Sequence, residues 1–75
     1  MGKLRVLSGQ GVCDILTANG FVFARHGKGD HNIYQNAAGE ITRTVPVPMH
    51  KELAVGTLSS IIRQSGLPRR LFEVS

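Results

Sequence analysis

A single cysteine, Cys13, in a chain of 75 residues sets the strongest limit on how this sequence can fold. One thiol makes no disulfide within the chain, and there is no set of cysteines to hold a structural zinc ion. A domain of this length buries only roughly 60% of the surface that its unfolded chain exposes. We therefore expect residues 1–75 to form one domain around one small core, with Cys13 packed in it.

The composition is typical of a folded globular protein, with 41% apolar and 19% charged residues. No run of 18 apolar residues is present, and the first residues lack the apolar stretch of a signal peptide. These features predict a cytoplasmic protein that does not enter a membrane. Nine Lys and Arg residues against five Asp and Glu give a net charge of +4, which favours a polyanionic partner, nucleic acid first.

The residues before and after Val12 predict a first helix over residues 9–19. Ser8 can cap this helix, and Leu7 is placed to pack on Val12 as a hydrophobic staple. Asn19-Gly20 supplies the stop signal.

A second helix is predicted to open at Gly56-Thr57 and to close at Gly66. Its apolar positions fall on one stripe: Leu58, Ile61 and Ile62. After it, Pro68 begins a last short turn that ends at Leu71 and Phe72.

Three runs rich in β-branched and aromatic residues predict strands: residues 21–24, 31–35 and 41–45. Residues 36–39 have the composition of a hairpin turn, and Pro46 and Pro48 are expected to end the third strand. The predicted fold class is α+β, with two helices packed on one face of a three-stranded antiparallel sheet. This α-β-β-β-α layout is similar to that of a double-stranded RNA-binding domain (dsRBD).

Residues 25–34 combine two glycines with positive charge and imidazoles. Glycine lets the backbone turn tightly and approach a ligand closely, so the stretch predicts a phosphate-holding loop. His31 is the candidate catalytic residue, because an imidazole exchanges protons near neutral pH. The alternative is a structural histidine at the start of a strand. Asp30 serves as a metal carboxylate, orients His31, or serves the geometry of the turn, and the turn is the commonest role of an Asp after glycine.

The candidate RNA-binding residues are mostly basic and are expected to be exposed. Their shared role would be contact with RNA phosphates, although each basic side chain alone could simply be solvated: Arg25, Lys28, Gly29, Arg43, His50, Lys51 and Arg63. Tyr34 either stacks on a base or packs in the fold. His26, His31 and His50 match no metal motif, so we expect neither a metal site nor a cofactor.

Several of these segments together resemble the HicA family of bacterial mRNA interferase toxins. The matching pieces include Asn19-Gly20-Phe21, Gly29 to Tyr34, Val45 to Leu53 and Gly56 to Leu67. Their order and spacing agree from about Ser8 to Phe72.

This resemblance implies a dsRBD-like fold, metal-independent cleavage of mRNA, and neutralisation by a HicB-type antitoxin. The family's catalytic histidine maps onto His31. Asp30 stands where the family usually has serine, and Asn32 where a second histidine is common. The start of the predicted second helix lacks the lysine cluster with which a dsRBD follows duplex phosphates, which argues against ordinary duplex binding.

The hypothesis that follows is an endoribonuclease in which the ribose 2′-OH attacks the adjacent phosphate. His31 would act as general base or general acid, with Arg25 and Lys28 stabilising the charge on the phosphate. One histidine cannot be base and acid at once, so water, Lys28 or another histidine must complete the proton transfer. The rival hypotheses are a non-catalytic RNA-binding module and a domain that mainly binds a protein partner.

Overall fold

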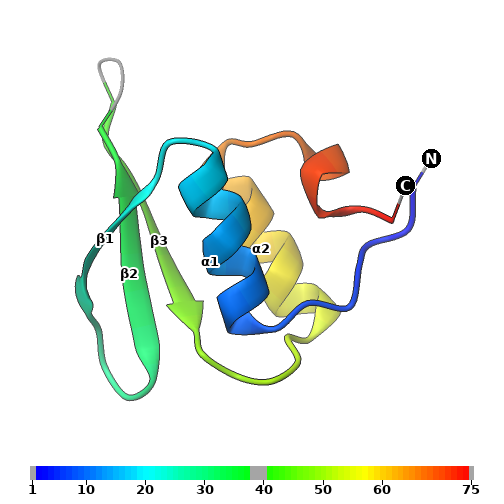
Figure 1. The fold of residues 1–75 in the computed structure, drawn as a ribbon, viewed down its shortest axis with the longest axis horizontal. Coiled ribbons are helices and arrows are strands. Elements are labelled where there is room, and N and C mark those ends of the chain that lie inside the picture. Colours follow the sequence, from blue (N-terminus) through cyan, green and yellow to red (C-terminus); the bar gives the residue numbers. More distant parts are fainter. Residues whose placement is uncertain (1, 38–40, 75) are drawn as a thin grey trace.

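The computed structural model describes residues 2–37 and 41–74, and it has the predicted α-β-β-β-α order (Figure 1). Its elements are α1 (Gly9–Ala18), β1 (Val22–His26), β2 (His31–Asn36), β3 (Arg43–Pro48), α2 (Val55–Ser65) and the 3-10 helix η1 (Arg69–Phe72). Both α-helices lie on the same side of the sheet. The predicted dsRBD-like α+β fold class is therefore confirmed.

Both predicted helices are confirmed, although α1 ends at Ala18, one residue before the predicted limit, and α2 begins at Val55, one residue before the predicted Gly56. The Ser8 hydroxyl accepts a hydrogen bond from the Gly11 amide at 3.0 Å at the start of α1. The Asn19 side chain donates to the Ile15 carbonyl at 2.8 Å at its end. Gly66 closes α2 in the left-handed conformation, with φ +69°.

The sheet has the order β1-β2-β3 with antiparallel pairing throughout. The pairs Tyr34↔Val45 and Asn32↔Val47 put these residues on one side, and both valines are fully buried in the core. We call this side the covered face. His31 and Ile33 alternate with those residues along β2, so they lie on the opposite side, which we call the open face.

The prediction that the third strand ends before Pro46 was wrong, because Pro46 lies inside β3, opposite Ile33. Pro48, opposite His31, is the last residue of the strand. The Met49 amide donates to the Asp30 carbonyl at 3.0 Å. In an antiparallel ladder the backbone N–H groups of alternate residues point toward the same neighbouring strand, so the backbone nitrogens of Pro46 and Pro48 point away from β2. Because β3 is an edge strand, the missing proline N–H groups break no ladder hydrogen bond.

The other strand limits shift by a few residues. β1 begins and ends later than the predicted 21–24, because Phe21 is a core residue that precedes the strand. β3 likewise begins at Arg43 and not at residue 41. The predicted hairpin turn at 36–39 lies partly outside the described residues.

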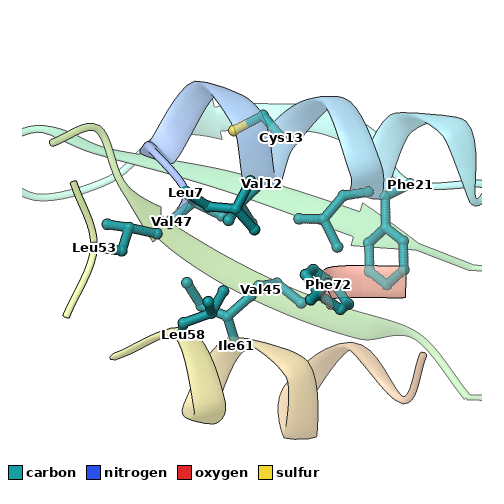
Figure 2. Close-up of a cluster of buried hydrophobic side chains, with 11 residues drawn as sticks. Leu7, Val12, Cys13, Phe21, Val45, Val47, Leu53, Leu58, Ile61 and Phe72 are labelled. Carbon is teal, nitrogen blue, oxygen red and sulfur yellow. The ribbon is translucent and has the colours of Figure 1, made fainter. Parts of the chain in front are cut away.

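One core joins both helices, the sheet and the C-terminal segment (Figure 2). Phe72 is fully buried in it, and the Leu4↔Glu73 bridge pairs the N-terminal segment with the C-terminal one. Cys13 packs in the core as predicted, and burial raises the pKa of its thiol. No helix in the described ranges is long and apolar enough to cross a membrane.

Candidate active site

A tight turn presents His31 at the end of the β1–β2 hairpin. The His31 amide donates to the Lys28 carbonyl at 3.2 Å, which closes a four-residue turn. Gly29, its first central residue, has φ +62°, and Asp30, the second, does not have a positive φ. This pattern is that of a type II′ turn, which favours glycine at the first central position.

The same carbonyl fixes the His31 ring. Its Nδ1 lies 3.0 Å from the Lys28 carbonyl oxygen, which can only accept a hydrogen bond. Nδ1 therefore carries the proton in the neutral ring, and Nε2 keeps its lone pair. Nε2 has no hydrogen-bond partner in the described part of the chain, and the side chain is 42% exposed. A base is thus presented to solvent in a fixed tautomer.

Asp30 joins His31 to a second histidine from a distant part of the sequence. One carboxylate oxygen lies 2.9 Å from His50 Nε2, and the other lies 3.8 Å from His31 Nδ1. The His50 contact is a close hydrogen-bonded pair, whereas the His31 contact is only an electrostatic one. We call Asp30, His31 and His50 the histidine cluster.

Backbone hydrogen bonds hold His50 beside the turn. Met49 is bonded to Asp30, and the His50 carbonyl accepts from the Gly9 amide at 2.9 Å, which ties it to the start of α1. A Cβ atom on Gly9 would lie 2.2 Å from the Pro48 carbonyl oxygen, so only glycine permits this approach. The sheet and the start of α1 therefore jointly hold His50 beside the turn.

Four of the other predicted RNA-binding residues lie near the histidine cluster. Lys28 and Gly29 form the turn, and exposed Lys51 follows His50 directly. Arg25 pairs with Ile33 on the open face, so it shares that face with His31. The structure thus brings the basic loop and the histidine cluster to one end of the sheet.

Arg43 and Arg63 lie toward the other end. Arg43 pairs with Asn36, the last residue of β2, whereas His31 is the first. At about 3.3 Å per residue, these ends of β2 are about 17 Å apart. The Arg43 guanidinium lies against Gly66 at the end of α2, close to Arg63 in its last turn. An RNA contacting all of these residues would have to span the sheet.

Tyr34 and His26, two further side chains considered in the sequence analysis, have partners within the fold. Tyr34 packs against the core and meets Phe23 edge to face at 5.8 Å between centroids, so the packing alternative holds. Burial also raises the Tyr34 pKa. His26 pairs with Asn32 at 2.9 Å on the covered-face side.

The described residues enclose no pocket, so the histidine cluster lies on an open surface. Within the same ranges there is also no group of three or more side chains arranged to hold a metal ion. The arrangement suits a long flexible ligand that is contacted from one side.

The Asp30–His50 pair is what sequence reasoning missed. A signal was present, because a β2–β3 hairpin that continues through the prolines puts Met49 opposite Asp30. Because the third strand was predicted to end before Pro46, its pairing with β2 was not extended as far as Met49 and Asp30. The sequence therefore indicated His50 as a phosphate-binding residue and Asp30 as a residue of the turn, without indicating that the two side chains meet.

A model of the family described as "HicA toxin of bacterial toxin-antitoxin" matches residues 9–67. The chain belongs to the HicA toxin family. As a HicA toxin it is the toxin component of a toxin-antitoxin system, and an antitoxin is its partner. The matched range includes the basic loop and the whole histidine cluster. Comparison with curated proteins gave no match.

Proposed function

We propose that this HicA toxin is a metal-independent endoribonuclease that cleaves mRNA in the cytoplasm, with His31 as a catalytic residue. The observation that carries the proposal is the ring orientation of His31. Its Nδ1 faces the Lys28 carbonyl, and its Nε2 is left with a lone pair at an exposed site. This is the arrangement that a general base requires.

In the proposed reaction, His31 Nε2 takes the proton of a ribose 2′-OH. The 2′ oxygen then forms a bond to the adjacent phosphorus, and the bond from phosphorus to the 5′ oxygen breaks. The leaving 5′ oxygen takes a proton, so the products are a 2′,3′-cyclic phosphate and a 5′-hydroxyl. A positioned base or acid contributes typically about 10²- to 10⁴-fold to such a rate.

Positive charge near His31 supports binding and cleavage of a polyanion. Arg25 and Lys28 are proposed to stabilise the charge that develops on the phosphate oxygens. Further contacts with the RNA phosphates around the turn are proposed for Gly29, His50 and Lys51. Arg43 and Arg63 are proposed to bind phosphates of a longer RNA at the far end of the sheet.

We also propose a HicB-type protein as the antitoxin partner. The toxin carries a net charge of +4, so an acidic partner could compete with RNA for the same basic surface. Covering the exposed histidine cluster would suffice to block cleavage, because the part of the chain that the structure describes forms no pocket around it.

Cleavage of an RNA oligonucleotide by the purified toxin in EDTA tests the proposal. We expect fragments with cyclic-phosphate ends by mass spectrometry, and no cleavage of the matching DNA, which lacks the 2′-OH. A strict need for a divalent metal would contradict the mechanism. Salt-sensitive binding of RNA without any cleavage would instead support a non-catalytic binding module.

A further inference from the structure

The proposed cleavage needs a second proton-transfer group, because the leaving 5′ oxygen must be protonated while His31 holds the proton of the 2′-OH. Within the described residues, four exposed basic side chains lie in or near the histidine cluster: His50, Lys28, Lys51 and Arg25. Arginine does not lose its proton in proteins, and lysine is a poor donor near neutral pH. His50 is the remaining group with suitable chemistry.

Resting on the proposed function, we propose that His50 is the general acid of this toxin and that Asp30 is its positioning residue. His50 Nε2 lies 2.9 Å from the Asp30 carboxylate, so Nε2 donates the hydrogen bond and its tautomer is fixed. In the imidazolium form both ring nitrogens carry a proton, and the hydrogen bond to Asp30 engages only the proton on Nε2. The Nδ1 nitrogen then remains to face the leaving oxygen.

The geometry divides the two roles between the two histidines. His50 has a close carboxylate partner, whereas the nearest acceptor to His31 Nδ1 is the uncharged Lys28 carbonyl at 3.0 Å, with Asp30 at 3.8 Å. An imidazolium at His50 therefore has a carboxylate directly against it, whereas the His31 ring has an uncharged carbonyl as its closest partner. His50 is accordingly the acid, and His31 is the base.

This assignment also explains why a site proposed to bind phosphate contains an acidic residue, Asp30. Alone, Asp30 would repel the substrate. Paired with a protonated His50, its charge is cancelled within one hydrogen-bonded contact. The exposed fractions of the two side chains, 57% for His50 and 56% for Asp30, leave the pair accessible to RNA.

A substrate with a sulfur atom at the bridging 5′ position of the cleaved bond tests the assignment, since a thiolate leaves without protonation. We expect His50→Gln to lower cleavage of ordinary RNA by about 10²- to 10⁴-fold. With the sulfur substrate, the same variant should cleave within about tenfold of the wild type. His31→Gln should stay slow on both substrates, because the 2′-OH still needs a base.

His26→Gln is the matched control, since His26 is an exposed histidine of the same hairpin whose partner is an amide. It should cleave both substrates like the wild type. The role of Asp30 is read from a double-mutant cycle: the loss caused by His50→Gln should shrink at least tenfold in an Asp30→Asn background. Thermal melting of each variant verifies the fold, and His50→Asn replaces His50→Gln if that variant melts early.

The outcomes separate the two proposals. A wild-type toxin that cleaves no RNA overturns the proposed function and this inference with it. A toxin that cleaves RNA, but whose His50→Gln variant is equally slow on both substrates, keeps the function and removes His50 as the acid. Additive effects of the Asp30 and His50 substitutions would remove Asp30 as the positioning residue.

Discussion

The two faces of the sheet use the same strands for different purposes. On the covered face, Tyr34, Val45 and Val47 pack under the helices, and both valines are fully buried. On the open face, His31 and Arg25 stand near a turn that positions polar groups without burying them. Side-chain alternation along β2 and β3 produces both faces.

This contrast teaches that stability and chemistry should be separable in this protein. A substitution on the covered face changes the free energy of unfolding, because it removes packed apolar surface. Substitution of an exposed or half-buried open-face side chain, such as Arg25 or His31, changes contacts with a ligand, because it has little packing to lose, whereas Ile33 on the same face is buried.

The largest effect is expected for His31→Gln, which removes the exposed imidazole from the open face. Cleavage of RNA should fall by about 10²- to 10⁴-fold. The free energy of unfolding should change by less than about 0.5 kcal/mol, as for other surface substitutions. Single-turnover cleavage and urea unfolding measure the two quantities. Undiminished growth arrest on induction of His31→Ala would contradict the assignment.

Phe72→Ala tests the core beneath the covered face. The ring is fully buried, so the variant should lose about 3–5 kcal/mol in the free energy of unfolding. Leu71→Ala is the control, because Leu71 is only partly buried and should cost less. Urea unfolding gives both values. A loss below about 1 kcal/mol for Phe72→Ala would show that η1 is not part of the stabilising core.

Gly66→Ala and Gly56→Ala compare two glycines of α2. Gly66 has φ +69°, so alanine there should cost about 1–2 kcal/mol in unfolding free energy. Gly56 lies in the first turn of α2, and a Cβ atom added there would meet nothing within 4 Å, so alanine should stabilise the protein by about 0.5 kcal/mol. Thermal melting compares them, and equal effects of the two substitutions would contradict the cap at Gly66.

Lys28→Gln and Arg63→Gln compare the two ends of the sheet as RNA contacts. Lys28→Gln should lower the salt dependence of binding by about 0.7 in log–log slope on short and long single strands alike. Arg63→Gln should do so only for RNA long enough to span the sheet. Fluorescence anisotropy titrations measure the slopes. Lys3→Gln is the control, because Lys3 is an exposed lysine of the N-terminal segment that is not among the proposed RNA contacts. An equal effect of Arg63→Gln on the shortest RNA would contradict this division.

The smallest effect concerns alkaline pH. Burial raises the pKa of Cys13 above its ordinary value of 9.0, so the folded state holds the thiol proton more tightly than the unfolded chain. This contribution to stability is complete below pH 9.0 and is lost as the pH rises through the folded-state pKa. Urea unfolding under reducing conditions should show a weaker alkaline decline for Cys13→Ala. An unchanged decline would exclude this contribution.

Local sequence signals sufficed where a few neighbouring residues decide the backbone. Ser8 and Gly66 mark the ends of two helices, because a side-chain cap and a left-handed residue act within one turn. Gly29 likewise predicted the turn that presents His31. The face of the sheet on which His31 lies needed the register, which sequence periodicity alone did not supply.

Local rules were insufficient at Pro46 and Pro48. A proline breaks a strand only where its missing N–H should face a neighbour, and that depends on which strand forms the edge of the sheet. The same error in register concealed the Asp30–His50 pair. Residues 20 positions apart meet here because β2 and β3 pair and α1 holds the segment that follows.

The sequence by itself therefore determined the order of the elements, the apolar residues of the core and the basic loop around His31. These follow from hydrophobic periodicity and from turn chemistry, which act over a few residues. The tertiary structure alone decided that His31 faces away from the helices and that Asp30 meets His50. Both depend on strand order and register, which are set by packing of the whole chain and not by any one segment.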